Sequence, residues 1–351
     1  MDEPNGPADP VDAALGRAFP DRSVAEVGAT GPSWNDSNRT VRVGFDDGRA
    51  AYLKLNVEGD GRRLARERAV LDYVGANADV SVPAVLDADT DGTIPYLVTE
   101  PVGRSFVRAW GDAGEARRER LARAMGRSLA GVHELRFDAH GTVVGRGDAV
   151  GAGRDGGPGL DLDRAPWTDV LVRTVEEMRA MAPSARFDDH FDRVVDAAET
   201  NRDLLNEAPA VLLHGDPAMP NCVLTDGGAD GAVDSSAGAD TDTTTTVGFL
   251  GWEMAHVGDP VRDLYRARDQ GFDGLRDPAP EPGVDAFFDG YRERADGLPD
   301  GYEARRPVYE AVRHLGNSGY FPKLAEYVDE PEEELAAWVD AEMDRRLAAV
   351  T

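Results

Sequence analysis

A short polar loop between two apolar runs holds the residues whose types and spacing best suit chemistry. Val211–Leu213 precedes the loop and Cys222–Leu224 follows it, and the loop contains Asp216 and, five residues later, Asn221. Such a pair suits phosphoryl transfer, because an aspartate can accept the proton of an attacking hydroxyl while an asparagine oxygen ligates magnesium. Both flanking runs have the length and branching of buried strands, so we expect the two side chains at fixed positions.

The motif around this pair extends further along the chain and resembles a known family. His214–Asp216 reads His-Gly-Asp, four residues separate it from Asn221, and Trp252–Glu253 and Gly258–Leu264 follow downstream. This combination resembles the aminoglycoside phosphotransferase and choline kinase-like family of small-molecule kinases, relatives of the protein kinases. The tripeptide alone is a common loop sequence, so the resemblance depends on the asparagine spacing and on the second block.

The resemblance implies a fold, a reaction and roles for the motif residues. The fold is a protein-kinase-like, bilobal α+β fold, with a nucleotide-binding lobe of antiparallel strands and one helix at 1–100. A mainly helical lobe at 101–351 carries catalysis and acceptor binding. The reaction is transfer of the γ-phosphoryl group of ATP, with Mg2+, to a hydroxyl of a small molecule. Asp216 is then catalytic, while His214 and Asp263 support its loop.

A lysine and a glutamate nearer the N-terminus are placed to form an ion pair. Lys54 lies within the predicted strand Ala50–Leu55, in a chain with only two lysines. Glu67 falls within the apolar stripe of the next predicted helix, where a carboxylate is costly unless it is paired. By the resemblance, Lys54 held by Glu67 binds the phosphates of ATP. The alternative is that Lys54 extends to water and Glu67 lies at a helix edge.

Two further segments are expected to contact the nucleotide. Segment 28–38, between the first two predicted strands, is polar but lacks the Gly-x-Gly-x-x-Gly pattern. We expect it to place backbone amides and Ser33 or Asn35 near the phosphates. The segment after the fifth predicted strand resembles the hinge between lobes, where backbone groups of Thr99, Glu100 and Val102 would bind the adenine edge. An ordinary hairpin loop and an edge strand with a turn are the respective alternatives.

One position departs from the family pattern. In relatives, an aspartate that holds magnesium precedes the Trp-Glu pair, and this chain has Gly251 there. Glycine offers the metal no anionic oxygen. Three interpretations stay open. Glu253 supplies the missing carboxylate near Asn221; or turnover is impaired, as in a pseudokinase, while nucleotide or metabolite binding survives; or the glycine is a recent change in a catalytic lineage.

Composition limits the classes of partner and the cellular location that we expect. The net charge of −28 disfavours nucleic acid and anionic membranes as partners. The acidic, lysine-poor composition resembles that of proteins from salt-loving archaea, a halophilic adaptation in which screening reduces self-repulsion. No apolar run reaches membrane-spanning length and the first residues lack the pattern of a signal peptide, so we expect a cytoplasmic protein. We expect a monomer or a weak dimer that binds a small-molecule hydroxyl acceptor.

The predicted elements change in kind along the chain. Strands and one amphipathic helix are predicted up to about residue 100, and helices dominate beyond it. Segment 145–159, rich in Gly and Asp, is predicted to be a mobile loop, and 225–246 a disordered insert between two strands. Cys222 is the only cysteine, which excludes internal disulfides. Nothing in the helical part identifies the acceptor.

Overall fold

The computed structural model describes residues 9–31, 37–147, 158–226, 245–276 and 281–350, and all statements below concern those residues. The chain divides into two compact units, and each is described by itself. The first unit comprises Met1–Ala113, Val143–Asp161 and Pro220–Ala255, and the second comprises Gly114–Thr142, Leu162–Met219 and His256–Thr351.

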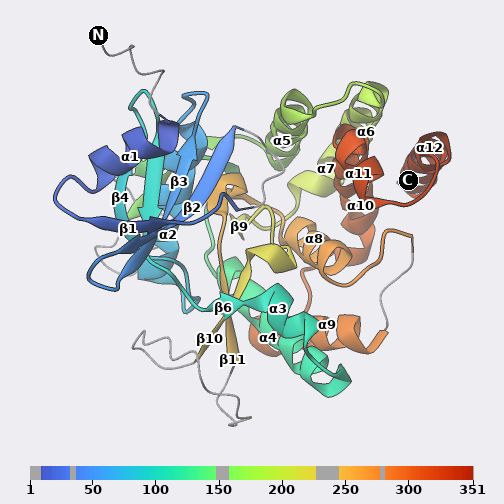
Figure 1. Ribbon diagram of the computed structural model, residues 1–351. Helices are drawn as coiled ribbons and strands as arrows, with labels where there is room; N and C mark the ends of the chain where they lie inside the picture. Colours follow the sequence, from blue (N-terminus) through green and yellow to red (C-terminus); the bar gives the residue numbers. More distant parts are fainter. Residues whose placement is uncertain (1–8, 32–36, 148–157, 227–244, 277–280, 351) are drawn as a thin grey trace. The chain divides into compact units, whose positions relative to one another are not determined.

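The first unit contains an antiparallel five-stranded sheet with the order β1-β2-β3-β5-β4 (Figure 1). Its strands are β1 Val24–Val27, β2 Asn38–Phe45, β3 Ala50–Asn56, β4 Val85–Asp89 and β5 Tyr96–Thr99. In the register, Val41 lies opposite Leu53 and Leu53 opposite Val98, so these buried side chains share one face. The alternate residues, among them Lys54, therefore share the other face.

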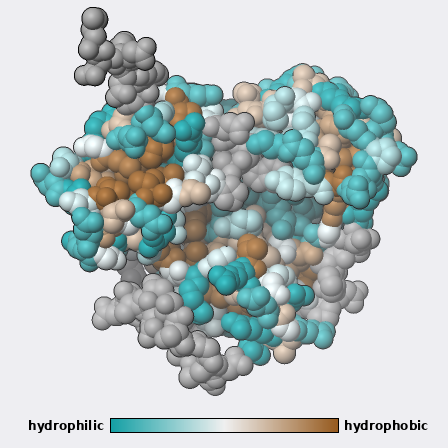
Figure 2. All heavy atoms as spheres, in the orientation of Figure 1, coloured by the Kyte–Doolittle hydropathy of each residue, from teal (hydrophilic) through white to brown (hydrophobic). Residues whose placement is uncertain are grey.

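A short helix covers the apolar face of this sheet. α1 (Pro10–Ala18) buries Val11, Ala14 and Leu15 against the strands, in one hydrophobic cluster with Leu53 and Leu55. Asp9 starts the helix, because its side chain accepts a hydrogen bond from the backbone amide of Val11. The outer strand is less protected. Figure 2 shows apolar side chains over β1 and β2, and Val24 and Val27 are 37% and 42% exposed.

A longer helix and a second sheet complete the first unit. α2 (Arg62–Asn77) follows β3 and buries Leu64, Glu67 and Tyr73 among other residues. The second sheet has the order β11-β10-β6, with β6 Arg104–Ser105, β10 Cys222–Asp226 and β11 Thr245–Phe249. The short helix α3 (Phe106–Gly111) follows β6, and Ser105 caps it by accepting a hydrogen bond from the amide of Arg108.

The second unit is mainly helical, and α4 and α9 lie side by side within it (Figure 1). Its helices are α4 Glu115–His133, α5 Trp167–Met181, α6 Asp188–Thr200, α7 Arg202–Asn206, α8 Pro260–Gly271, α9 Glu281–Ala295, α10 Tyr302–Gly319, α11 Phe321–Tyr327 and α12 Glu332–Ala348. Acidic residues in the first turn of α12 and basic residues in its last turn match the direction of the helix dipole. The predicted α+β fold, antiparallel strands first and mainly helices after, is confirmed.

A third sheet was not expected from the sequence. Its order is β8-β7-β12-β9, with β7 Gly141–Gly147, β8 Gly159–Arg164, β9 Val211–Leu213 and β12 His256–Gly258. The ends of the predicted mobile loop 145–159 therefore belong to strands, and its residues 148–157 lie outside the described part of the chain. These strands pair with partners far along the chain, a contact that local sequence does not encode.

Other boundaries also differ from the prediction. The predicted insert 225–246 is narrower, because β10 continues to Asp226 and β11 begins at Thr245, and residues 227–244 lie outside the described part. The sequence of 188–205 suggests a single helix, but the structure has two helices there, α6 and α7, that meet at Asn201. In the described ranges, no helix combines the length and the apolar character needed to cross a bilayer.

Candidate active site

The loop that carries the His-Gly-Asp motif is held by a buried carboxylate in the second unit. The backbone amide of His214 donates to Asp263 Oδ2 at 2.6 Å, and that of Gly215 donates to Oδ1 at 3.1 Å. Gly215 has φ +84°, which glycine adopts without a steric penalty. Burial raises the pKa of the Asp263 carboxyl, but the nearby His133 and further positive groups outweigh burial and bring it to about 2. Asp263 is therefore an ionised brace for this loop.

The helix that supplies this brace begins at a well-defined cap. Asp259 accepts a hydrogen bond from the amide of Val261 at 3.0 Å, and Pro260 occupies the first turn of α8. The Asp259 carboxylate also accepts from Arg305 Nε and from the Tyr309 hydroxyl, both at 2.6 Å. An aspartate directly before a proline is the sequence pattern of a helix start, and the structure confirms this role for Asp259. These contacts fix the position from which α8 presents Asp263.

Asp216 is held by an arginine that the sequence analysis did not single out. Arg266 Nε donates to Asp216 Oδ1 at 3.0 Å, and Arg266 Nη2 lies 2.9 Å from the same oxygen. Arg266 lies on α8, three residues after Asp263, so the helix that braces the loop backbone also holds the Asp216 side chain. The Asp216 carboxylate is 30% exposed, as a group that meets a substrate must be.

The sequence around His256 suggests a loop, and this prediction is wrong. His256 lies in β12, is 3% exposed, and stacks on the Trp167 ring with the centroids 5.7 Å apart. Its Nε2 atom is 3.1 Å from Arg262 Nη1. The strand is only three residues long and pairs with β9, so nothing in its own sequence marks it.

In the first unit, Lys54 bridges two carboxylates. Lys54 Nζ lies 2.6 Å from Glu67 Oε2 and 2.7 Å from Glu253 Oε2. Burial lowers the pKa of the Lys54 ammonium, but the charges of Glu253 and Glu67 outweigh burial and raise it above its ordinary value. Burial raises the pKa of Glu67, and Lys54 partly offsets this. The pair of Lys54 with Glu67 matches the spacing noted in the sequence, whereas the contact with Glu253 was not anticipated.

Gly251 stands where the family resemblance implies an aspartate, and it lies between two side chains that offer oxygen atoms as metal ligands. The register of β10 and β11 sets Cys222 opposite Phe249, and the amide of Leu250 donates to the Asn221 carbonyl at 2.8 Å. A Cβ atom at Gly251 would lie 3.2 Å from Asn221 Oδ1 and 3.5 Å from Glu253 Oε2. A side chain at this position would therefore point between the amide of one residue and the carboxylate of the other.

The donors in this region fit magnesium in kind. An amide oxygen from Asn221 and one carboxylate from Glu253 are hard oxygen ligands, and Mg2+ commonly takes one or two carboxylates together with phosphate oxygens and water. Within the described ranges, no group of three His, Cys, Asp or Glu residues is arranged to hold a metal by itself. A metal here would therefore depend on nucleotide phosphates for the rest of its ligands.

The residues predicted to contact the nucleotide base are placed at the end of β5. Thr99 is paired on both sides, with Tyr52 of β3 and Val85 of β4. The amide of Glu100 donates to the Ala84 carbonyl at 2.9 Å, so it is already engaged in the sheet region. Val102 follows β5 outside any strand.

One predicted site residue and one predicted grouping of residues fall outside what the structure describes. Ser33 lies outside the described residues. Lys54, Asn221 and Glu253 belong to the first unit, whereas His214, Asp216 and Asp263 belong to the second, so each set is described within its own unit.

The fold of the chain is shared with known phosphotransferases. It resembles the crystal structure of aminoglycoside phosphotransferase APH(4)-Ia, with a TM-score of 0.58 and 15% identity, covering 97% of this chain and 99% of that one. A ternary complex of a thermostable APH(4)-Ia mutant with ADP and hygromycin B gives a TM-score of 0.57 and 14% identity, covering 97% and 98%. A putative fructosamine-3-kinase from Thermobifida fusca gives 0.57 and 19%, covering 96% and 99%.

The sequence itself places the chain in a family. A search of the curated proteins found no significant match. The model of the phosphotransferase enzyme family, APH, matches residues 29–234, which is more than half of the chain and includes Lys54, Glu67, Asp216 and Asn221. On this match, the chain belongs to the phosphotransferase enzyme family APH.

Proposed function

We propose that this protein transfers the γ-phosphoryl group of ATP to a hydroxyl of a small molecule. The observation that supports this most is the pair of donors around Gly251, next to a lysine held between two carboxylates. Asn221 Oδ1 and Glu253 Oε2 flank the site of the missing aspartate, and Lys54 is 2.7 Å from that same Glu253 oxygen. Amide oxygen, carboxylate and ammonium together are what a metal-bound triphosphate requires.

In this proposal each residue has a separate task. Asp216 orients the acceptor hydroxyl and accepts its proton, and Asp263 keeps the backbone of the loop in place through His214 and Gly215. Lys54, kept charged by Glu67 and Glu253, contacts the α- and β-phosphates.

Asn221 and Glu253 are the residues that would hold magnesium, which when bound neutralises phosphate charge. Most of the rate then comes from positioning and from charge neutralisation.

The nucleotide contacts are proposed at the end of β5 and in the loop after β1. Since the amide of Glu100 is already bonded to Ala84, its carbonyl and the backbone of Val102 are the better candidates for the adenine edge, beside Thr99. Ser33 is proposed near the phosphates. A structural neighbour whose complex holds ADP and hygromycin B supports a nucleotide and a small-molecule acceptor as the two ligands.

A second candidate function is favoured by one specific contact. Glu253 forms an ion pair with Lys54, so the carboxylate that we propose as a replacement for the family aspartate already has a cationic partner. If that pair persists when nucleotide binds, metal binding is weak, and the protein is a catalytically impaired module that binds a nucleotide or a metabolite.

Titration of ATP with and without Mg2+, at high salt, tests the proposal. Metal-dependent ATP binding, followed by phosphate transfer to one member of an acceptor panel, is the expected result. Metal-independent binding with no transfer to any acceptor would support the second candidate instead. Glu253→Gln isolates the metal role: it is expected to weaken Mg2+ affinity about tenfold or more, a loss of roughly 1.4 kcal/mol, and an unchanged affinity would exclude Glu253 as a ligand.

The role of Asp216 has its own test. Asp216→Asn keeps the shape and one acceptor oxygen but removes the base, so transfer is expected to fall about 100-fold or more while ATP affinity stays within about twofold. Transfer at the wild-type rate in this variant would contradict the role of Asp216.

A further inference from the structure

The charged groups around Asp216 in the second unit are mainly arginines. Arg266 binds Asp216 Oδ1 through Nε and Nη2, and its Nε also lies 3.0 Å from Gln270 Oε1. Arg262 stands one helical turn earlier on α8, so its side chain shares a face with that of Arg266. Two guanidinium groups are therefore brought close together beside the proposed base.

Arg262 is buried and, among the described residues, makes no direct ion pair. It is 3% exposed, and among the described residues no carboxylate lies within 4.0 Å of its guanidinium group. Its side chain contacts His256 Nε2 at 3.1 Å, while its Nε has no hydrogen-bond partner in the described part of the chain. Burial lowers the pKa of Arg262 to about 10 and the charge of Arg266 adds to this, whereas the charges of Asp263 and Asp216 act in the opposite direction and offset it only in part. A buried charge without a direct ion-pair partner is unfavourable.

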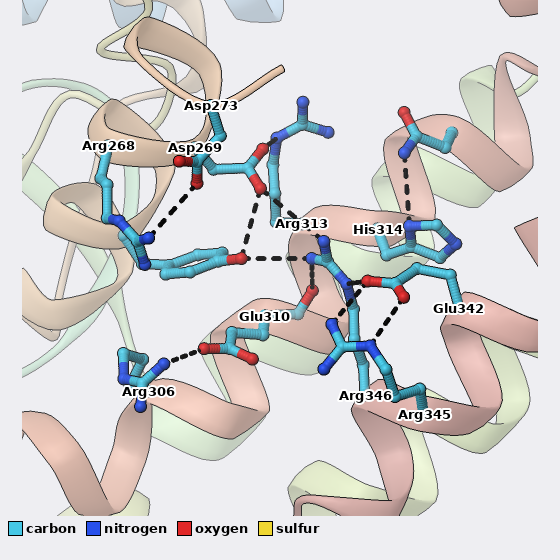
Figure 3. Close-up of polar contacts among 12 residues, drawn as sticks. Arg268, Asp269, Asp273, Arg306, Glu310, Arg313, His314, Glu342, Arg345 and Arg346 are labelled. Atoms are coloured by element: carbon cyan, nitrogen blue, oxygen red, sulfur yellow. Dashed lines mark hydrogen bonds and ion pairs between the residues drawn. The ribbon is translucent and has the colours of Figure 1, made fainter. Parts of the chain in front are cut away.

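The carboxylates of a neighbouring network form ion pairs with other arginines. Figure 3 shows this network between α8, α10 and α12. Asp269 Oδ2 lies 2.8 Å from Arg313 Nε, and Glu342 Oε1 lies 2.7 Å from Arg346 Nε. The Nη atoms of Arg313 point away from Asp269 in Figure 3. The remaining acids drawn there are also paired: Glu310 with Arg306, and Asp273 with Arg268 at 3.7 Å.

We propose that the acceptor is an anionic hydroxy compound, whose carboxylate or phosphate group binds between Arg262 and Arg266 while its hydroxyl meets Asp216. The inference rests on the proposed phosphotransfer for the role of the hydroxyl, but the oxyanion site itself does not depend on it. An oxyanion gives Arg262 an ion-pair partner at contact distance and accepts hydrogen bonds from guanidinium groups in their preferred geometry. A polycationic acceptor would face two positively charged arginines, and the carboxylates drawn in Figure 3 already form ion pairs with other arginines.

Binding of inorganic phosphate to the full-length protein tests the oxyanion site without turnover. Equilibrium dialysis at constant ionic strength, with KCl as the balancing salt, would compare the wild type with Arg262→Met, Arg266→Gln and Arg268→Gln. Arg268 lies on α8 two residues after Arg266, on a different face, and is the matched control.

We expect the first two variants to weaken phosphate binding about tenfold or more, which is roughly one charge-assisted hydrogen bond. Arg268→Gln should leave this phosphate site intact. Without phosphate, Arg262→Met should unfold at or above the wild-type temperature, since it removes an unpaired buried charge.

Two results would overturn the oxyanion site. One is phosphate binding that is absent, or equal in the wild type and Arg262→Met. The other is a marked loss of thermal stability of Arg262→Met in phosphate-free buffer, which would make Arg262 a structural residue.

A set of related acceptors then tests the substrate class. Gluconate, glucose and glucosamine differ in charge at similar size, and glucose 1-phosphate separates phosphate from carboxylate. We expect kcat/KM to be highest for the anionic compounds, and Arg262→Met to raise KM for them about tenfold with kcat within about threefold. Preference for glucosamine would overturn the inference. Arginine-dependent phosphate binding without transfer to any acceptor would leave the oxyanion site standing and refute the phosphotransfer proposal instead.

Discussion

At the scale of single residues, the proposed metal site depends on the backbone conformation of Gly251. Its backbone has φ 72° and ψ 57°, the left-handed region, which suits glycine and which Asp and Asn enter more readily than other residues. A Cβ there would lie 3.2 Å from Asn221 Oδ1, a close contact that needs only a small shift of that side chain. The local backbone is therefore compatible with the aspartate that relatives carry.

Restoring that aspartate should raise activity. Gly251→Asp places a carboxylate between Asn221 and Glu253, so we expect Mg2+ affinity and phosphate transfer to rise about tenfold or more, at a cost of about 1–3 kcal/mol in folding free energy for the left-handed backbone. Gly251→Ala carries the same backbone cost without the carboxylate and is the control. Equal activity of both variants would show that metal binding does not limit the rate.

The sequence identified the residues that belong to a motif and missed those that meet only in space. Asp216, Asn221 and Asp263 could be singled out because their spacing follows the family pattern. The contacts of Lys54 with Glu253 and of Asp216 with Arg266 join residues that are far apart in the sequence, and no periodicity connects them. The arginines of α8 could have been noticed from their four-residue spacing, but spacing alone does not show that Arg262 is buried.

At the scale of elements, Lys54 joins three segments of the first unit. It lies on β3 and binds Glu67 of α2 and Glu253 of the short helix η2 (Trp252–Met254). Glu67 also accepts a hydrogen bond from the amide of Trp252 at 3.3 Å. Removing the ammonium leaves two carboxylates close together in a mostly buried place, which is strongly unfavourable.

Lys54→Met should therefore be destabilised in a pH-dependent way. We expect a loss of about 3–5 kcal/mol near neutral pH. Burial already raises the pKa of Glu67 above its unfolded value, and loss of Lys54 raises it further. An acid of this kind favours the fold below its unfolded pKa, and the benefit is lost as pH rises through the folded pKa. Urea unfolding from pH 4 to 8 should show the deficit growing with pH. The double variant Lys54→Met/Glu67→Gln should show a smaller deficit and little pH dependence.

The hydrogen bonds between the motif loop and Asp263 of α8 lead to a second prediction at this scale. Asp263→Asn loses the charge that accepts from the amides of His214 and Gly215, so we expect a loss of about 2 kcal/mol. The pKa of Asp263 is held at about 2, below its unfolded value. Its contribution is therefore complete above about pH 4 and is lost as pH falls toward 2. Thermal unfolding of the wild type and of Asp263→Asn, measured from about pH 4 down to about pH 2, should show the difference in their unfolding temperatures disappearing. A difference that persists at pH 2 would contradict this account.

Element types were predictable where a segment is long and strongly patterned, and much less so elsewhere. The helix predicted at 167–181 and α5 agree at both ends, because its apolar stripe is continuous. β6, β7, β8 and β12 were missed. They are short or glycine-rich, and they exist because distant strands pair with them.

At the scale of the whole molecule, the excess of acidic groups should govern behaviour in salt. The chain carries 66 Asp and Glu against 38 Lys and Arg, so self-repulsion opposes the folded state at low ionic strength. The screening length falls from about 10 Å at 0.1 M salt to about 3 Å at 1 M. We expect the unfolding temperature at neutral pH to rise with KCl over this range.

The same measurement near pH 4.5, the sequence pI, is the control, because little net charge is left to screen there. An equal rise at both pH values would assign the effect to something other than charge repulsion. We propose on the same grounds a halophilic protein. That it is a monomer or weak dimer stays a separate prediction, and sedimentation in high salt would measure the oligomeric state.

The left-handed backbone at position 251 also has an evolutionary consequence. Glycine and aspartate codons can differ by one base, and the left-handed main chain makes the exchange cost folding free energy in one direction only, since glycine relieves the backbone strain that aspartate carries. On the proposed metal site, a lineage with this loop trades stability against a metal ligand in one mutational step, and homologues that differ at this codon would carry a natural version of the experiment.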